Sequence, residues 1–365
     1  MIDGNFAMTT KTILISGCAG FIGSHLARKL VNNYKVIGVD NFCLGFEKNI
    51  RDILNHENFT FHYKDIRNIS SLDIKDVYLI YHLAAQTELY ECQANPKEAI
   101  DINILGTVLM LDFAKKVNCE HFVFMDTSAE YDNLDPNDSI SYSYPSLCVS
   151  GFISRDPIIS TDKLWYPSRE DIAPSFQTPM GFYSITKMAA SQFVRAWSQE
   201  NNKGSSIIRP FNVYGPSLNL NRDIPPVIGA FAKKLLKKEN PIIYGDGSKR
   251  RDFIYVSDCI DFLEKIIEKR YGNTRSETYN LGRGINYSVF DIYKLVSTEI
   301  LGANKDLWIE PIYKDDEKHQ SLMNLADMSK TCSYFNWNPV VDIKEGIHET
   351  VKSIAKELRV EYESE

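Results

Sequence analysis

The run Thr-Ile-Leu-Ile-Ser-Gly-Cys-Ala-Gly-Phe-Ile-Gly, residues 12–23, decides the fold that this chain predicts. Its first five residues, Thr12–Ser16, are apolar or β-branched and indicate a buried strand. Three glycines follow at a spacing of three, and the amphipathic stretch 22–31 predicts a helix. Glycine permits a tight turn and a close approach to a pyrophosphate, which the helix N-terminus then binds through its N–H groups. The run therefore predicts a dinucleotide-binding site.

Further strands and helices alternate beyond this run. Apolar runs predict strands at 34–40, 59–63, 79–83, 121–125 and 206–209, and a helical pattern covers 104–117. This alternation implies right-handed βαβ units and a doubly wound parallel sheet of the Rossmann type. Ligands bind such sheets at the carboxyl ends of the strands. The C-terminal third mixes short strands with helical patterns at 228–238, 258–269 and 289–300, and predicts a smaller α/β substrate-binding part.

Two domains are expected from this layout. Residues 11–210 would form the dinucleotide-binding domain, and residues 211–360 would mainly bind the substrate, with some segments returning to the Rossmann core. Within the first domain, residues 132–165 are rich in Asn, Asp, Ser, Pro and Tyr. Because loops of this length are uncommon unless they have a function, this stretch predicts an inserted loop or lid.

The composition argues against several classes of partner and ligand. The chain has 365 residues, 44% of them hydrophobic, and can therefore bury a sizeable core. Its formal net charge of −7 argues against a nucleic-acid partner, which needs a basic face. No apolar run approaches the roughly 18 residues that a membrane span needs. The seven cysteines are dispersed without CxxC spacing, which indicates reduced thiols, a cytoplasmic protein and no metal site.

Asp40 ends the second predicted strand, where a carboxylate would accept hydrogen bonds from the ribose hydroxyls of a dinucleotide. The same carboxylate would repel a 2′-phosphate, so the sequence favours NAD over NADP. The alternative for Asp40 is a helix cap or a turn residue.

Tyr183 and Lys187 are four residues apart at the start of an amphipathic run, so that they share one face of a helix. A tyrosine titrates near about 10 and is a poor base at neutral pH. A cation about 4 Å away contributes roughly 4 kcal/mol at an effective dielectric constant of about 20, which lowers the phenol pKa by about three units. The pair therefore predicts a general base. The alternative is an ordinary surface Tyr and Lys one turn apart.

These motifs, with others in the same order, resemble the extended short-chain dehydrogenase/reductase family of nucleotide-sugar epimerases and dehydratases, in particular its UDP-glucose 4-epimerase-like members. The resemblance covers nearly the whole chain. The motifs that carry it are Gly17-x-x-Gly20-x-x-Gly23, Asp65-Ile66, residues 82–86, Asn103 in Asn-Ile-Leu-Gly-Thr, Tyr183-x-x-x-Lys187, residues 209–216, Gly245-Asp-Gly247, residues 251–253 and residues 279–282.

The resemblance implies an NAD site in which Asp65 and Ile66 contact the adenine, and in which Lys187 also holds the nicotinamide ribose. The residues expected to bind the cofactor are Gly17, Gly20, Phe21, Ile22, Gly23, Asp40, Asn41, Asp65, Ile66, Leu83, Ala84, Ala85, Asn103, Tyr183 and Lys187.

It also implies a catalytic trio of Thr127, Tyr183 and Lys187, in which the Thr127 hydroxyl bonds the sugar hydroxyl that is oxidised; Ser128 is the second choice. The residues expected to bind the nucleotide sugar are Gln86, Thr127, Ser128, Asn212, Tyr244 and Arg251. Arg250 competes with Arg251 for the diphosphate. A second family arginine, expected at 312–322, is absent, which leaves Lys314, Lys318, His319 or Arg222 to replace it.

One departure from the family bears on the reaction. Dehydratases of this group carry an acid two residues after the threonine, and Ala129 stands there, with Glu130 displaced by one. The resemblance and this departure together predict an isomerase of carbohydrate biosynthesis: an NAD-dependent epimerase acting at C4 of a UDP-hexose or related nucleotide sugar through a 4-keto intermediate. The base, the sugar and the carbon stay open.

Three alternatives remain. A 4,6-dehydratase or decarboxylase would need another acid, such as Glu130 or Glu88, or a contribution from Cys92. A net reductase would need exchangeable NADPH, against which Asp40 argues. A catalytically silent NAD-binding scaffold need not keep the whole catalytic trio. By analogy with the family, we also expect a homodimer through helices 104–117 and 185–199.

Overall fold

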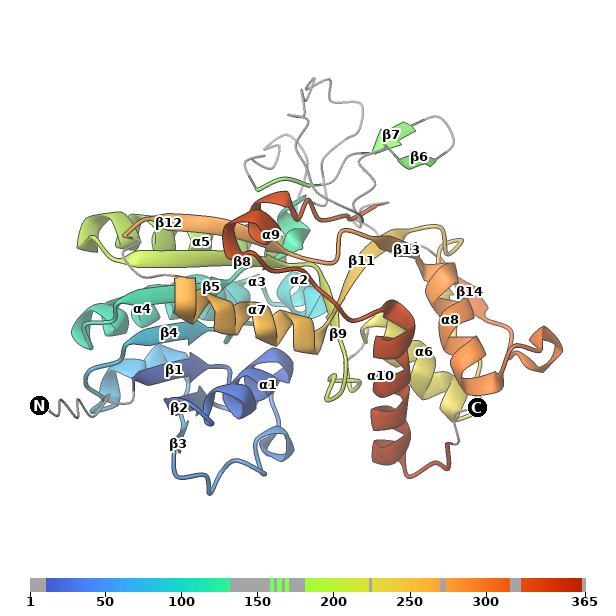
Figure 1. Cartoon of the computed structure of the whole chain (residues 1–365), viewed down its shortest axis with the longest axis horizontal. Coiled ribbons are helices and arrows are strands. Elements are labelled where there is room, and N and C mark those ends of the chain that lie inside the picture. The colour runs from blue at the N-terminus through green and yellow to red at the C-terminus, as the bar shows by residue number, and fades with distance from the viewer. Residues whose placement is uncertain are drawn as a thin grey trace, which may run out of the picture.

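The computed structural model describes residues 11–131, 158–160, 163–165, 168–170, 181–222, 225–269, 274–315 and 323–362. One extended sheet contains strands from the first 210 residues and one strand from much later in the chain (Figure 1). All of its seven strands are parallel, in the order β12 (Ser276–Leu281), β8 (Gly204–Pro210), β5 (His121–Met125), β4 (Leu79–His82), β1 (Thr12–Ser16), β2 (Lys35–Asp40) and β3 (Phe59–Tyr63). The predicted doubly wound sheet is confirmed.

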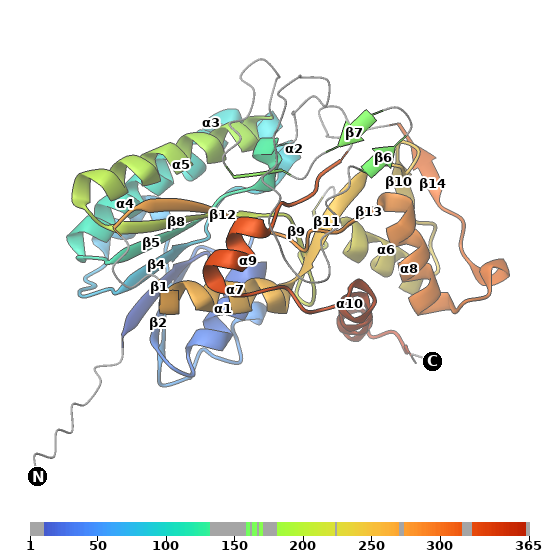
Figure 2. The same cartoon turned by 45° about the horizontal axis from the view of Figure 1, so that its top comes forward.

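Helices cover both faces of this sheet (Figure 2). On one face lie α1 (Phe21–Leu30), α7 (Val256–Lys269) and α9 (Ser329–Phe335), and on the other lie α4 (Gly106–Lys116) and α5 (Phe182–Asn201). Successive residues of β1 serve the two faces in turn. Ile13 and Ile15 join one apolar core, whereas Leu14 joins the other. A strand that is buried on both faces reads as an uninterrupted apolar run, as the sequence of β1 does.

The C-terminal part packs around a third core, formed by Phe231, Ile292, Tyr293 and Ile347 among others. Its helices are α6 (Val227–Leu236), α8 (Val289–Leu301) and α10 (Ile343–Leu358). A three-stranded sheet has the order β13 (Asn286–Ser288), β11 (Arg250–Tyr255) and β9 (Asn212–Tyr214), and β10 (Ile242–Tyr244) pairs with β14 (Ile312–Lys314). A capping box between Ser288 and Asp291 fixes the start of α8.

Shorter elements connect these parts. They are the helices α2 (Leu89–Ala94) and α3 (Pro96–Ile100), the 3₁₀ turns η1 (Glu47–Asn49), η2 (Ile66–Ser71), η4 (Ser128–Tyr131) and η5 (Lys305–Leu307), and the π-helical turn η3 (Asp101–Leu105). The helix predicted at 104–117 therefore begins as a π turn and continues as α4. Of the predicted insertion, β6 (Ile158–Ser160) pairs antiparallel with β7 (Lys163–Trp165), and its other residues lie outside the described part.

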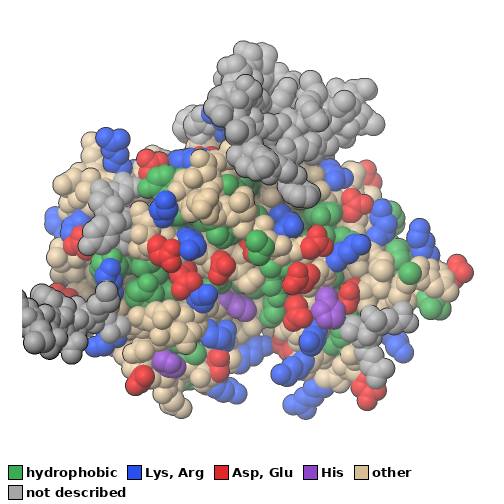
Figure 3. Space-filling view, viewed as in Figure 1, with side chains coloured by type: hydrophobic (Ala, Val, Ile, Leu, Met, Phe, Trp, Pro, Cys, Tyr) green, Lys and Arg blue, Asp and Glu red, His purple; other side chains and the backbone are tan. Residues whose placement is uncertain are grey.

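The surface carries charges of both signs. On the face shown in Figure 3, Lys and Arg side chains are interspersed with Asp and Glu side chains. Among the described residues, no helix has the length and apolar character that a membrane span requires. The described residues also hold no group of three or more His, Cys, Asp or Glu side chains placed for a metal ion.

Candidate active site

The predicted site residues gather at the carboxyl ends of the central strands. The strand order reverses between β1 and β4, which is where doubly wound sheets bind their ligands. The Leu83 N–H donates to Ser16 O at 3.1 Å, so the segment after β4 lies directly beside the glycine turn after β1. Two segments that were predicted separately to contact NAD are therefore neighbours.

The glycine turn leaves no room for side chains at two positions. Gly17 has a φ of +75°, and a Cβ atom there would lie 2.7 Å from Ala84 N. A Cβ atom on Gly23 would lie 2.1 Å from Gly17 O, so α1 packs against the turn at backbone contact distance. This geometry leaves the N-terminus of α1 open to a pyrophosphate, and the residues present fit a bound dinucleotide.

Asp40 stabilises the glycine turn and is also placed to bind a ribose, so that it fits both roles considered for it. Its Oδ2 accepts from the Ala19 N–H at 2.9 Å, and its Oδ1 accepts from the Phe42 N–H at 2.8 Å, so that it braces the turn. Burial raises the pKa of this carboxyl above its ordinary value, and these backbone hydrogen bonds oppose the rise. Each oxygen keeps a further lone pair for a ribose hydroxyl.

The predicted adenine contacts differ in exposure. Asp65 is half-buried; the guanidinium of Arg67 lowers its pKa, and the Asn41 amide donates to its Oδ2 at 3.0 Å. Ile66 is buried, and a Cβ atom on Gly106 would lie 2.7 Å from Ile66 Cδ1. The Ile66 side chain packs η2 against α4, and its contact with the adenine stays a prediction.

Asn103 connects three elements. It sits in the π turn η3, its Oδ1 accepts from the Gln86 N–H at 2.8 Å, and its Nδ2 donates to Gln86 O and Thr186 Oγ1, both at 3.0 Å. Thr186 precedes Lys187 in α5. Asn103 thus fixes the segment after β4 relative to the start of α5, and π turns frequently mark functional sites.

The predicted catalytic trio lies together. Tyr183 and Lys187 are one turn apart in α5, and Thr127 follows the end of β5. The Thr127 side chain lies close enough to the Tyr183 phenol to lower its pKa, and the Ala129 N–H donates to Thr127 Oγ1 at 3.1 Å. Ser128 Oγ instead accepts from Asn324 Nδ2 at 3.4 Å. Thr127, the first choice of the sequence analysis, is therefore the hydroxyl beside the tyrosine.

The predicted lowering of the Tyr183 pKa is wrong for this structure. Burial raises the pKa of Tyr183 well above its ordinary value, and the Thr127 hydrogen bond and the Arg222 charge oppose the rise without reversing it. Burial also lowers the pKa of Lys187 to about 8, against the charges of Asp126 and Glu130. Both groups pay a desolvation penalty that the sequence argument left out.

A buried ionic cluster lies behind the trio. Arg209, at the end of β8, contacts Asp126 Oδ2 through Nε at 3.2 Å, Glu130 Oε2 through Nη2 at 2.5 Å, and the Tyr131 hydroxyl through Nη1 at 2.9 Å. The sequence analysis missed Asp126 and did not connect Arg209 with it. The available signal was that both residues end neighbouring strands of the predicted sheet.

The alternative acids occupy different places. Glu130 is fully buried against Arg209, so it has no exposed surface from which to protonate a leaving hydroxyl. Glu88 pairs with Arg222 at 3.4 Å, and Arg222 Nη2 donates to Thr87 Oγ1 at 2.9 Å. Burial raises the pKa of the Cys92 thiol to about 11, which leaves it protonated at neutral pH.

The residues predicted to bind the nucleotide and its diphosphate lie on three strands: Asn212 on β9, Tyr244 on β10 and Arg251 on β11. The guanidinium of Arg250 contacts Asn286 at 2.9 Å and 3.0 Å and Asp291 at 3.6 Å, so Arg250 is committed to the fold. The Arg251 guanidinium donates to Arg250 O at 2.9 Å. Asn212 Nδ2 donates to Asp252 O at 2.9 Å, which places it beside the strand that carries Arg251.

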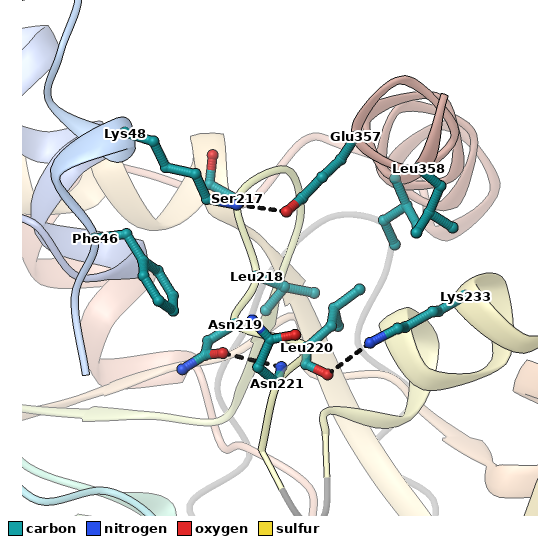
Figure 4. A pocket seen from close by; sticks show the side chains of 11 residues that line it. Phe46, Lys48, Ser217, Leu218, Asn219, Leu220, Asn221, Lys233, Glu357 and Leu358 are labelled. Carbon is teal, nitrogen blue, oxygen red and sulfur yellow. Dashed lines mark hydrogen bonds and ion pairs between the residues drawn. The ribbon is translucent and has the colours of Figure 1, made fainter. Parts of the chain in front are cut away.

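Two hollows lie away from the trio. Tyr244 lines an open one together with Tyr313, Lys314 and Asp315. Of the expected replacements for the second arginine, Lys314 therefore lies beside Tyr244, whereas Lys318 and His319 are outside the described residues. A small pocket of about 70 Å³ lies between residues 217–221 and α10, where an ion pair joins Lys48 to Glu357 (Figure 4). No predicted site residue lines that cavity.

A glycine-lined dinucleotide turn on a Rossmann sheet, with a Thr, Tyr and Lys trio at the strand ends, defines an extended short-chain dehydrogenase/reductase. The sequence model of the "NAD dependent epimerase/dehydratase family" matches residues 13–147 and 158–282. The chain belongs to this family of enzymes, and its cofactor is NAD.

Similar proteins include UDP-sugar epimerases and UDP-glucuronic acid decarboxylases. A putative UDP-glucose 4-epimerase of Methanocaldococcus jannaschii is 28% identical over 340 residues, which are 93% of this chain and 97% of that protein. UDP-glucuronic acid decarboxylase 1 of Danio rerio is 27% identical over 351 residues, 95% of this chain and 73% of that protein. The crystal structure of Thermotoga maritima UDP-glucose 4-epimerase with UDP-glucose has a TM-score of 0.78 at 27% identity, covering 95% of this chain and 99% of that one.

Proposed function

We propose that this protein is a nucleotide-sugar epimerase that inverts C4 of a UDP-hexose or a related nucleoside-diphosphate sugar. The observation that carries the proposal is the placement of Thr127, just after β5, beside Tyr183 of α5, with Ala129 where a lyase of the family carries its acid. An epimerase needs one base and one hydride acceptor, and it needs no acid to expel a leaving group.

The cofactor would lie across the strand ends. The glycine turn and the N-terminus of α1 would hold the pyrophosphate, Asp40 the adenosine ribose, and Lys187 the nicotinamide ribose. Bound NAD would supply a hydride acceptor and a positively charged nicotinamide ring. The remaining chemistry falls to Tyr183, Thr127 and Lys187.

Tyr183 as phenolate would remove the proton of the C4 hydroxyl, which Thr127 orients by a hydrogen bond. The positive charge of Lys187 would stabilise the phenolate. After the 4-keto sugar turns over in the pocket, Tyr183 would return its proton to the C4 oxygen from the opposite face. The residues end in the protonation states in which they began, as a reaction without net oxidation requires.

The nucleotide end would anchor the substrate while the sugar turns. Arg251 would bind the diphosphate through its forked guanidinium, Asn212 would bind an adjacent oxygen, and Tyr244 would contact the base. Gln86 and Ser128 would contact the sugar. The nucleotide would be bound tightly and the sugar loosely, because the keto sugar must rotate without leaving the site.

A decarboxylase or dehydratase is the second candidate, because the relatives include UDP-glucuronic acid decarboxylases. The observation in its favour is Glu88, whose partner Arg222 is near enough to influence the pKa of Tyr183. In this scheme Glu88 would supply the acid that Ala129 cannot.

The two candidates differ in their products. The protein as isolated, with no added cofactor, would be incubated with UDP-, dTDP-, GDP- and CDP-sugars, including uronic acids, and followed by NMR. A diastereomer of the same mass supports the epimerase. Loss of water or carbon dioxide, abolished in Glu88→Gln, would instead establish the second candidate.

We further propose a homodimer and a cytoplasmic location. Phe182, Ile185 and Phe193 recur on one stripe of α5 and are exposed, as are Ile100 and Leu105 before α4. A stripe of large apolar side chains in water favours association with a second copy. All six cysteines that the structure describes are unpaired, which supports a reducing compartment.

A further inference from the structure

Lys187 of the proposed catalytic trio lies near three other buried ionisable side chains. Asp126 comes from the end of β5, Glu130 from η4, Lys187 from α5 and Arg209 from β8, and each is less than 5% exposed. Lys187 Nζ also lies 4.1 Å from the centre of the Phe124 ring, in a site screened from water. Charges in such surroundings interact strongly, so their balance matters to any group that ionises beside them.

Arg209 places the two carboxyl groups side by side. Its Nε contacts Asp126, its Nη2 contacts Glu130, and these two nitrogens form one edge of the guanidinium. Two carboxylates that share one edge repel each other, and one of them takes up a proton in preference to both being charged.

One oxygen of each carboxyl group is left over. Asp126 Oδ1 and Glu130 Oε1 are buried and have no hydrogen-bond donor among the described residues. Leaving a buried oxygen without a donor is costly, and two in one cluster call for a missing hydrogen. A proton on Glu130 would give Asp126 its donor, because Arg209 holds the two carboxyl groups on one edge of its guanidinium.

We propose that Asp126 and Glu130 share a single proton, carried by Glu130, and that the negative charge on Asp126 acts as a positioning charge that keeps Lys187 protonated during the reaction. The role in the reaction rests on the proposed function of Tyr183 and Lys187, whereas the shared proton does not.

The surrounding charges agree with this assignment. Burial and the neighbouring carboxylate raise the pKa of Glu130, whereas Arg209 and Lys187 oppose the rise. Arg195, further along α5, adds another cation close to both carboxyl groups. Tyr131 lies beside Arg209, and the Glu170 carboxylate influences Tyr131 in turn. Burial lowers the pKa of Lys187, and among the neighbouring charges Asp126 opposes this most strongly.

The shared proton also fits the charge that catalysis develops. With Asp126 ionised, Glu130 neutral and Lys187 and Arg209 charged, the four groups carry a net charge of +1. Ionising Tyr183 then brings the buried site to zero. Without the shared proton the four groups would already sum to zero, and the phenolate would be an uncompensated buried charge.

Infrared spectroscopy tests the proton directly and without turnover. The wild-type protein at neutral pH should show the carbonyl band of a protonated carboxylic acid, and the Glu130→Gln variant should lack it. The band should also disappear when the wild-type protein is titrated to alkaline pH, so the test does not depend on a variant folding. Absence of the band, or its survival in Glu130→Gln, would overturn the proposal whatever reaction the protein catalyses.

Activity profiles test the positioning charge. Asp126 raises the pKa of both Tyr183 and Lys187, so Asp126→Asn should move both limbs of the kcat/KM profile to lower pH, by roughly one unit. Glu130→Gln, which replaces a neutral acid by a neutral amide, should leave both limbs in place. Movement of the limbs in Glu130→Gln alone would put the charge on Glu130, and an unchanged profile in Asp126→Asn would make the cluster purely structural; either result contradicts the proposal.

Discussion

Replacing Gly23 by alanine tests the dinucleotide turn most sharply. The added Cβ atom would lie 2.1 Å from Gly17 O, and an acceptable contact of about 3.2 Å requires α1 to retreat by roughly 1 Å. Such a shift loosens the packing of Leu26, Ala27 and Leu30 in the core and costs about 3 kcal/mol, the upper end for overpacking. The better helix propensity of alanine returns about 1 kcal/mol. We therefore expect Gly23→Ala to lose about 2 kcal/mol of unfolding free energy.

The matched control is Gly20→Ala. A Cβ atom on Gly20 meets only Gly17 O, at 3.2 Å, and Gly20 is the N-cap of α1 with φ −71° and ψ 178°, which alanine readily adopts. We expect a loss below about 1 kcal/mol here. Urea unfolding with an unchanged slope measures both variants, and NAD titration should show at least a tenfold weaker affinity in Gly23→Ala. Equal stability of the two variants would refute the claim that backbone contact between Gly23 and Gly17 fixes α1.

Four further predictions concern the site and the surface. Tyr183→Phe should lower kcat by roughly 10³-fold while NAD still binds by calorimetry, because only the proton transfer is lost; near-normal turnover would remove Tyr183 as the base. Thr127→Val should lose at least about tenfold more activity than Ser128→Ala, with Thr127→Ser restoring most of it; equal losses would mean that Thr127 has no special role. Since the pKa of Lys187 is lowered to about 8 and its protonated form is the active one, the alkaline limb of the kcat profile should fall as pH rises through about 8; a pH–rate profile that is flat there would contradict this. Phe193→Lys should halve the mass measured by light scattering, and an unchanged mass would exclude the stripe on α5 as the dimer contact.

The local parts of the fold were readable from the sequence. The strands at 12–16, 59–63 and 121–125 have their predicted bounds, because an apolar run followed by a turn is a local signal. The seventh strand, Ser276–Leu281, was not predicted as a strand. It pairs with β8, some seventy residues earlier in the chain, and a polar–apolar hexapeptide does not reveal so distant a partner.

In the site, too, the local features were predictable and the long-range contacts were not. Tyr183 and Lys187 were found because their spacing is local to one helix. The Asp126–Arg209 contact joins residues 83 apart and became visible only when β5 and β8 were placed side by side. The sequence preferred Arg251 to Arg250 through its motif alone, and that choice stays a prediction; the Arg250 contacts with Asn286 and Asp291, which support it, join distant parts of the chain and could not be predicted.

The sequence predicted a lowered pKa for Tyr183, and the structure raises it, for a physical reason. The spacing of Tyr183 and Lys187 reveals the attraction of one cation, whereas the cost of burying the phenolate depends on every atom packed around it. Nor does the spacing reveal that burial weakens the charge of Lys187 itself.

The most direct test of the proposed epimerase follows the hydrogen on C4. The protein as isolated, with no added cofactor, would be given the nucleotide sugar that it converts, carrying deuterium at C4, in ordinary water, and the product would be examined by NMR and mass spectrometry. The account predicts an inverted C4 that keeps its deuterium, since the same hydride leaves and returns within one site. Loss of the label to solvent, or a product lighter by water or carbon dioxide, would contradict it.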